Sequence, residues 1–168
     1  EDVFLINSLK NSIKEKSENH MIVDLVRNDL SRIAKKGTVK VTELSKINTY
    51  KNIHQMVSTI EAQIENDVFF SKILKSTFPM GSMTGAPKIK TMKIIDELEE
   101  TSRGIYSGAI GYIDPNKNFD FNVVIRTIIY DDKLSKISVN VGSGITFKSN
   151  PEDAVSYTHL RAHETIQH

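Results

Sequence analysis

The chain has 168 residues, of which 39% are apolar and 26% charged, and its formal net charge is +1 at pH 7. These values are typical of a soluble globular protein, without the basic excess that attracts nucleic acid and without an apolar run long enough to span a bilayer. Cysteine is absent, and the first residues lack the basic-then-apolar pattern of a signal peptide. We therefore expect a cytoplasmic protein that binds neither nucleic acid nor membrane.

The first hundred residues are predicted to be mainly helical, with a β region between the helices. Helical spacing of apolar residues covers 2–34, where the polar stretch 14–20 separates two apolar stripes. The second stripe consists of Ile22, Leu25, Asp29 and Ile33. Gly37 ends this run, and the β-branched segments TVKVTEL and HQMVSTIEAQI follow. DVFFSKILKSTF then predicts a helix that Pro79 ends, and residues 87–100 predict an amphipathic helix.

The last third of the chain has the character of a β-sheet. YSGAIGYID, FDFNVVIRTIIY and KISVNVGSGI predict three strands, with turns at 114–118 and 131–133. Sequential strands with short turns predict an antiparallel meander. The expected fold class is therefore α+β, with helices packed on antiparallel sheet.

The loop FPMGSMTGAPK, residues 78–88, combines turn residues with features of an anion site. It does not fit a P-loop, because Lys88 does not directly follow the second glycine. Thr84 as N-cap and Pro87 in the first turn fit a helix start, whose free N–H groups suit an anion. Gly85 would let a ligand approach the backbone. A capped helix after a tight turn explains the same residues without a ligand.

Arg126 and a glycine bend offer two further anion contacts. The run FNVVIRTIIY places Arg126 within an apolar strand. A buried guanidinium there needs an anionic partner from the protein or from a ligand, whereas an edge position would leave it open to water. Gly142, Ser143 and Gly144 follow one strand later. They can form a bend whose N–H groups converge on an anion, or a simple turn or bulge.

Glu18 lies on the apolar stripe of its predicted helix, four residues before Ile22. A carboxylate there is either solvated or a ligand of a cation, and Mg²⁺ commonly takes one or two protein carboxylates. A helix start, an arginine, a glycine bend and a possible Mg²⁺ ligand together suggest a small polycarboxylate substrate.

Five segments in this order resemble the chorismate-utilising enzyme family: ENHMIVDLVRND, FPMGSMTGAPKIKTMKIIDELE, YSGAIGYI, IRT and VGSGI. The resemblance runs from residue 1 to about residue 152. It implies an α+β fold of two stacked antiparallel sheets flanked by helices. Residues 1–153 would then be the C-terminal part of the chorismate-binding catalytic domain.

The resemblance also implies roles for individual residues. The implied substrate-binding residues are Thr84, Gly85, Lys88, Tyr106, Arg126, Gly142, Ser143 and Gly144. Arg126 would grip a substrate carboxylate, and Glu18 would help to hold Mg²⁺, a Lewis acid toward the substrate. The family often has a histidine near the leaving hydroxyl, at the position of Gln55 here, one residue after His54. The catalytic candidates are therefore His54, Gln55 and Thr84.

Two segments, FPMGSMTGAPK and HQMVSTI, are most similar to the aminodeoxychorismate branch of the family. That branch aminates chorismate to 4-amino-4-deoxychorismate, toward para-aminobenzoate and folate. It depends on Mg²⁺ and receives ammonia from a glutamine amidotransferase subunit or domain. The alternatives are the anthranilate branch of tryptophan synthesis and a non-catalytic remnant domain. The P-I-K-G-T motif that separates the two branches is absent, so the product stays open.

The end of the chain departs from the family pattern. After SNPED, the family continues with an E-Y-x-E helix that supplies another Mg²⁺ glutamate, and residues 154–168 do not match it. We interpret residues 154–168 as an atypical, non-native tail. We accordingly expect the chain as given to be truncated and inactive by itself.

Overall fold

The computed structural model describes residues 2–147, 149–152 and 155. The chain divides into two compact units, unit 1 over Glu1–Leu98 and unit 2 from Glu99 onward. The predicted boundary between a catalytic region (1–153) and a tail (154–168) stays a prediction, because apart from Val155 the tail lies outside the described residues.

Unit 1 has helices on either side of a β-hairpin in the sequence. Its elements are α1 (Asp2–Asn11), α2 (Ile13–Ser31), β1 (Lys40–Tyr50), β2 (Ile53–Glu61), α3 (Phe70–Thr77), α4 (Gly81–Thr84) and α5 (Lys88–Leu98). The single helix predicted over 2–34 is in fact two helices. Ser12 ends the first because its side chain accepts a hydrogen bond from the Glu15 N–H at 3.2 Å and so caps α2.

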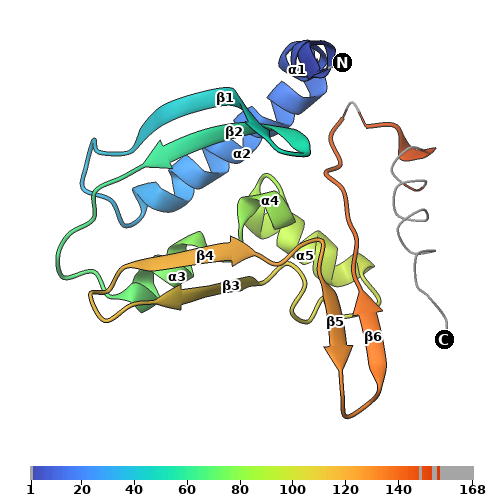
Figure 1. The fold of residues 1–168 in the computed structure, drawn as a ribbon. Coiled ribbons are helices and arrows are strands. Elements are labelled where there is room, and N and C mark those ends of the chain that lie inside the picture. The colour runs from blue at the N-terminus through green and yellow to red at the C-terminus, as the bar shows by residue number, and fades with distance from the viewer. Residues whose placement is uncertain (1, 148, 153–154, 156–168) are drawn as a thin grey trace. The chain divides into compact units, whose positions relative to one another are not determined.

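The core of unit 1 lies between α2 and the β1–β2 hairpin, which run alongside each other (Figure 1). The predicted apolar stripe is confirmed at three of its four positions, Leu25, Asp29 and Ile33, which are all buried. Ile22 is only half-buried, and its neighbour Val23 is buried instead. Burial of Asp29 among apolar residues calls for a partner, and Lys88, the first residue of α5, is that partner.

The antiparallel pairing of β1 with β2 carries two register irregularities, one of them between Glu43 and Lys46. Ser45 lies there with a φ of 51°, in the left-handed region that non-glycine residues rarely adopt. Such a bulge bends the strand and redirects side chains. Beyond it the pairing is regular, and Thr49 stands opposite His54.

Unit 2 contains two antiparallel hairpins. Its strands are β3 (Ala109–Ile113), β4 (Phe119–Val123), β5 (Ile128–Asp131) and β6 (Lys136–Val139), paired as β3–β4 and β5–β6. The turn predicted at 114–118 is confirmed, since the Asp114 carboxylate accepts the Asn118 N–H at 2.8 Å. The three-strand meander is wrong, because the long middle run divides at Arg126. Its φ of 51° is incompatible with an extended strand.

The predicted α+β class is confirmed. Among the described residues, the strands form three two-stranded antiparallel sheets. Within the same residues, no helix has the length and apolar character needed to cross a membrane.

Candidate active site

The glycine-rich loop forms the short helix α4 and then turns into α5. Thr84 is the last residue of α4 and not the N-cap of α5, so the predicted cap is wrong. Its hydroxyl donates to the Met80 carbonyl oxygen at 3.2 Å, and the Gly81 carbonyl oxygen lies at 3.5 Å. Gly85 ends α4, because its φ of 130° is not helical. Glycine suits this position, because residues with a side chain rarely adopt such a φ. The Thr84 hydroxyl proton is therefore engaged in the bond to Met80, whereas its oxygen can still accept a hydrogen bond.

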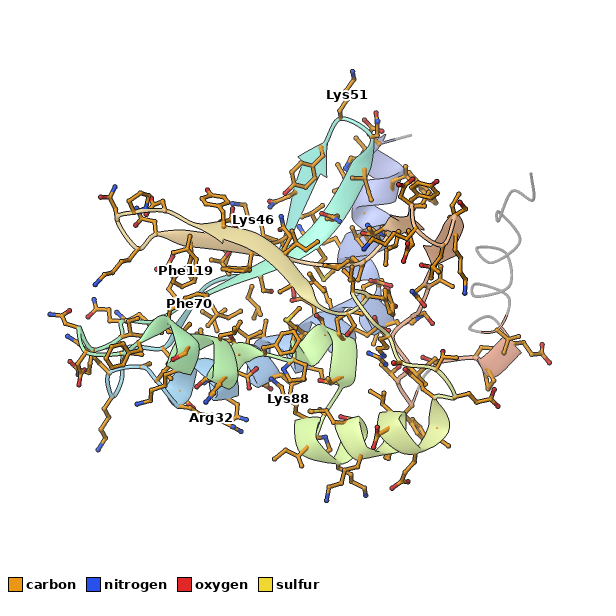
Figure 2. All side chains as sticks on the ribbon, turned by 90° about the horizontal axis from the view of Figure 1, so that it is seen from below. Arg32, Lys46, Lys51, Phe70, Lys88 and Phe119 are labelled. Atoms are coloured by element: carbon orange, nitrogen blue, oxygen red, sulfur yellow. The ribbon has the colours of Figure 1, made fainter. Side chains whose placement is uncertain are left out.

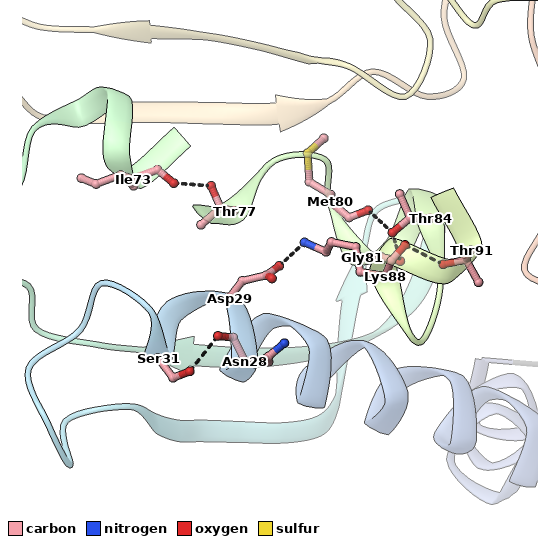
Figure 3. A network of polar contacts seen from close by, with 10 residues as sticks. All are labelled: Asn28, Asp29, Ser31, Ile73, Thr77, Met80, Gly81, Thr84, Lys88 and Thr91. Atoms are coloured by element: carbon pink, nitrogen blue, oxygen red, sulfur yellow. Dashed lines mark hydrogen bonds and ion pairs between the residues drawn. The ribbon is translucent and has the colours of Figure 1, made fainter. Parts of the chain in front are cut away.

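The loop is attached to α2 at two points, and Figure 3 shows one of them, the ion pair of Asp29 with Lys88. A Cβ atom on Gly81 would lie 2.9 Å from both Cβ and Cδ1 of Leu25, so the backbone contacts α2 directly. Lys88, at the start of α5, forms an ion pair with Asp29. Both side chains are largely buried, with 13% of Lys88 and 5% of Asp29 exposed. The loop is therefore fixed by packing at one end and by charge at the other.

Lys88 differs in burial from the other lysines that Figure 2 labels: Lys46 also pairs with a carboxylate, that of Glu43, but its side chain is 55% exposed. Lys51, in the turn between β1 and β2, is exposed and extends away from the hairpin (Figure 2). Lys88 instead has its ammonium on a carboxylate of its own unit. The resemblance implies that Lys88 lies at the substrate, and the structure gives it an internal partner.

His54 and Gln55 are neighbours on β2 with opposite surroundings. The His54 Nδ1 atom lies 3.0 Å from the Thr49 hydroxyl and its Nε2 atom 3.7 Å from the Asp2 carboxylate. Its side chain is 12% exposed, whereas Gln55 is exposed. Because side chains alternate along a strand, the two residues face opposite sides of the hairpin and do not serve one site together.

Glu18 has the properties of a cation ligand. Its Oε1 atom is buried and has no hydrogen-bond partner among the described residues, and the nearest cation, Lys14 Nζ, is 4.0 Å away. Burial raises the pKa of the Glu18 carboxyl, Lys14 lowers it and Glu15 raises it further. A buried carboxylate oxygen that accepts no hydrogen bond fits Mg²⁺. The described part of the chain has no cluster of three or more acidic or histidine residues around it. The family's second glutamate would fall within 154–168, which does not match the family pattern and, apart from Val155, lies outside that part.

Sequence reasoning missed a polar network beside Glu18. The Asn19 side-chain oxygen accepts hydrogen bonds from the hydroxyls of Ser45, at 3.2 Å, and Ser58. The Ser45 N–H in turn donates to the Ser58 hydroxyl at 2.9 Å. The turn of α2 that carries Glu18 is thus joined to the bulge in β1. The sequence offered only one hint of this network, a serine in each of β1 and β2. Ser45 and Ser58 are 26 and 39 residues away from Asn19, too far for a local pattern to connect them.

In unit 2, two predicted substrate-binding residues lie together. A Cβ atom on Gly142 would lie 2.6 Å from the Tyr106 hydroxyl oxygen, so the tyrosine occupies the space that any side chain would need. Ser143 and Gly144 continue from Gly142 without helix, strand or turn, and all three are exposed. Tyr106 and the backbone of this segment therefore form one local group.

Arg126 lies on the bend between β4 and β5, not within a strand as predicted, and it is exposed. The apolar run favoured one long strand, but the left-handed backbone at Arg126 interrupts it. Its guanidinium has no hydrogen bond or ion pair within the described residues. A planar donor of this kind, held on a bend and unpaired, suits a carboxylate.

Comparison with known proteins places these residues in a family. The sequence profile of the chorismate binding enzyme family matches residues 1–166. An aminodeoxychorismate synthase of Arabidopsis thaliana, described as chloroplastic, is 46% identical over 153 residues, which are 91% of this chain and 16% of that protein. Anthranilate synthase component 1 of Acinetobacter calcoaceticus is 37% identical over 167 residues, 99% of this chain and 33% of that protein.

A solved structure agrees with the sequence comparisons. The crystal structure of anthranilate synthase component I from Streptococcus pneumoniae TIGR4 superimposes with a TM-score of 0.81 at 32% identity, over 97% of this chain and 37% of that one. The chain therefore spans well under half the length of each of these three relatives. The family profile nonetheless covers almost every residue, and this chain belongs to the chorismate binding enzyme family.

Proposed function

We propose that this protein aminates chorismate to 4-amino-4-deoxychorismate in a Mg²⁺-dependent reaction, with ammonia supplied by a glutamine amidotransferase subunit or domain. The proposal is supported by the order of the five motifs and by the similarity to a protein named aminodeoxychorismate synthase. The structural observation that carries it is Arg126, an exposed guanidinium on a bend without a partner among the described residues. Chorismate carries two carboxylates, and a bidentate contact with arginine is a strong way to hold one.

The other residues of unit 2 contribute to carboxylate recognition in this proposal. Backbone N–H groups of 142–144 are assigned to the enolpyruvyl carboxylate. Gly142 supports this assignment, because it brings the backbone against the Tyr106 hydroxyl with no side chain between them. Donors that are already in place lose little entropy when the substrate binds.

In unit 1, Glu18 is the residue that would hold Mg²⁺. The ion, when bound, supplies Lewis-acid polarisation of the substrate and neutralises carboxylate charge. The buried Oε1 atom supports this assignment, because it has no hydrogen-bond partner among the described residues and its ion pair with Lys14 is long, at 4.0 Å. Asn19 would hold the same turn of α2 in place through its hydrogen bonds to Ser45 and Ser58.

In the proposed reaction, ammonia nitrogen forms a bond to the ring, the bond from the ring to the 4-hydroxyl breaks, and water leaves with a proton from nitrogen. We assign the position beside this hydroxyl to Gln55, whose side chain is exposed. Its amide donates a hydrogen bond but does not transfer a proton. His54 faces the opposite side of the hairpin, where one ring nitrogen lies at Thr49, so we assign it to holding β2 against β1 and not to this step. Thr84 and Gly85 would line the pocket, with the Thr84 oxygen accepting a hydrogen bond.

Anthranilate synthesis is the second candidate, and two similarities favour it. These are the 37% identity to an anthranilate synthase component 1 and the TM-score of 0.81 to a solved structure of the same name. Both reactions begin from chorismate and ammonia, so the product distinguishes them. A non-catalytic role is the third possibility and is distinguished by a lack of turnover.

Product analysis tests the proposal. The protein expressed from its complete reading frame is incubated with chorismate, ammonia and Mg²⁺, and the products are separated and weighed by mass spectrometry. We expect 4-amino-4-deoxychorismate, which retains the enolpyruvyl group, without release of pyruvate. Anthranilate together with pyruvate would establish the second candidate. An unmodified chorismate pool would establish the third.

The cellular location and the partner stay predictions. The lack of cysteine motivates the cytoplasmic prediction, whereas the Arabidopsis relative is described as chloroplastic. Turnover that accepts glutamine only after a glutamine amidotransferase is added would support the proposed partner.

A further inference from the structure

We propose that the Asp29–Lys88 ion pair is a buried latch that holds the loop 78–88 on α2, and that Lys88 is a positioning residue and not a substrate contact. The positioning role of Lys88 rests on the proposed function, whereas the latch itself does not.

The two attachment points of the loop are one helical turn apart on α2. Leu25 and Asp29 are four residues apart, so their side chains lie on the same face of the helix. Leu25 contacts the start of α4 at Gly81, and Asp29 binds Lys88 at the start of α5. The segment between these points contains Thr84 and Gly85. A single face of α2 thus holds both ends of the segment that is proposed to line the pocket.

The start of α5 adds to this attachment. The Thr91 hydroxyl lies 3.0 Å from the carbonyl oxygens of both Pro87 and Lys88, so it ties the first turn of α5 to the residue before it. Lys88 is therefore held at its backbone as well as at its ammonium. Movement of the loop away from α2 would separate a buried carboxylate from its cation.

Burial favours the pairing of Lys88 with Asp29 over the binding of Lys88 to a ligand. Only 5% of the Asp29 side chain is exposed, so its charge would be poorly solvated without Lys88. Releasing Lys88 to bind a substrate carboxylate would leave that charge uncompensated. An internal partner is therefore favoured over an anionic ligand. Asp29 is itself an anion and has no favourable contact to offer a dicarboxylate, so any effect of Asp29 on chorismate use must act through the loop.

Hydrogen exchange on the protein expressed from its complete reading frame tests the latch without any ligand. The variants are Asp29→Asn, Lys88→Met and the two combined, and Lys88→Arg tests whether the charge suffices. In each single variant, we expect amides of residues 80–91 to exchange at least about tenfold faster, because a buried charge loses its partner. Lys88→Arg should keep most of the protection. The double variant should lose no more protection than the worse single variant, because the two changes remove the same interaction.

Two internal controls separate a local effect from general unfolding. Asp24→Asn makes the same chemical change on the same helix, but Asp24 forms an exposed pair with Arg27 at 3.0 Å. We expect it to leave exchange in 80–91 unchanged. The β1–β2 hairpin should stay protected in all variants. Unchanged loop exchange would overturn the latch, and so would equally rapid exchange in the hairpin, since the pair would then stabilise the whole unit.

Steady-state kinetics with chorismate test the positioning role. A loosened loop spends less time in the conformation that binds, which raises KM but leaves kcat near normal at saturation. We therefore expect both Asp29→Asn and Lys88→Met to raise KM at least about fivefold with little change in kcat. A fall in kcat for Lys88→Met with an unaltered KM for Asp29→Asn would show a direct substrate contact and overturn this half. If the unmodified protein does not convert chorismate, the proposed function fails, while the exchange experiment still decides the latch.

Discussion

Arg126 and Lys88 are two cations that the family resemblance assigns to the substrate, and their surroundings differ. Lys88 is buried against Asp29, whereas Arg126 is exposed on a bend and has no partner among the described residues. A cation with an internal carboxylate is committed to the fold, and one without is available to a ligand. Their substitution should therefore have different consequences for stability and for substrate use.

Arg126→Ala is expected to lower kcat/KM for chorismate by the equivalent of about 2–5 kcal/mol, as loss of a paired carboxylate contact does. Arg126→Gly should be equally impaired but more stable than Arg126→Ala by about 1 kcal/mol, because glycine adopts the φ of 51° without strain. Kinetics and urea unfolding measure the two effects. Lys133→Ala, an exposed cation of unit 2, is the control. Near-normal kcat/KM in folded Arg126→Ala would contradict the assignment.

Glu18 is expected to reduce stability in the absence of Mg²⁺. Burial raises the pKa of its carboxyl in the folded protein, so the folded state binds more protons than the unfolded state just above the ordinary pKa of 4.5. Stability should then fall as pH rises through this range. Glu18→Gln removes this partly buried charge, so it should raise the free energy of unfolding slightly at pH 7, because the partly exposed ion pair with Lys14 that is lost with it contributes little. This advantage should vanish below the ordinary pKa, where both side chains are neutral.

Added Mg²⁺ should make the unmodified protein more stable than Glu18→Gln. Binding to the folded state alone stabilises it, so added Mg²⁺ should raise the Tm of the unmodified protein and not that of Glu18→Gln. Thermal unfolding with and without Mg²⁺ at pH 7 measures both. An equal rise in Tm for the two proteins would show that Glu18 is not a ligand.

At the scale of elements, α2 connects two parts of unit 1 that are proposed to carry function, Glu18 and the glycine-rich loop. Its first half bears Glu18 and is joined through Asn19 to the bulge at Ser45, and its second half holds the glycine-rich loop. The bulge keeps a non-glycine residue in a left-handed conformation, which persists only where surrounding bonds support it. Asn19 and Ser58 provide those bonds.

Asn19→Ala should therefore destabilise unit 1 by about 1–2 kcal/mol, because two hydrogen bonds are lost from half-buried serines. Asn28→Ala makes the same change at an exposed position of α2 and should have nearly no effect. Urea unfolding followed by circular dichroism compares the two variants. Equal effects would mean that helix propensity, and not the network, dominates at these positions.

At the scale of the whole molecule, the chain is divided into two compact units that meet in sequence at Leu98 and Glu99. Residues 99–102 lie outside the helices and strands and are exposed. Exposed backbone without regular hydrogen bonds is where proteases cut first. Glu99 is bonded to Arg103 at 2.9 Å and 2.6 Å, which leaves Glu100 as the more accessible glutamate.

Brief digestion with a glutamate-specific protease should accordingly cut after Glu100 before it cuts after Glu97, which lies within α5. Mass spectrometry of the early fragments identifies the first cut. First cleavage within α2, for example after the exposed Glu15, would show that the helix opens more readily than the segment between the units.

Local patterns predicted most elements of the fold. Periodic apolar residues predicted the helical regions and the burial of Leu25 and Ile33, since helical spacing places these side chains on one face. They did not predict the break at Ser12, because a capped turn inside a helical run depends on the hydrogen bond to Glu15. They also predicted one strand across Arg126, because an apolar run carries no sign of a left-handed residue within it.

The sequence by itself determined the α+β class, the family motifs and the identity of the candidate site residues. Those properties depend on residue type and on spacing over a few positions, which can be read directly. Tertiary structure alone decided which of the candidates are free for a ligand. Lys88 is held by Asp29, 59 residues away, and Gly142 lies against the Tyr106 hydroxyl. Contacts over such separations arise only when the chain has packed, so no local pattern in the sequence encodes them.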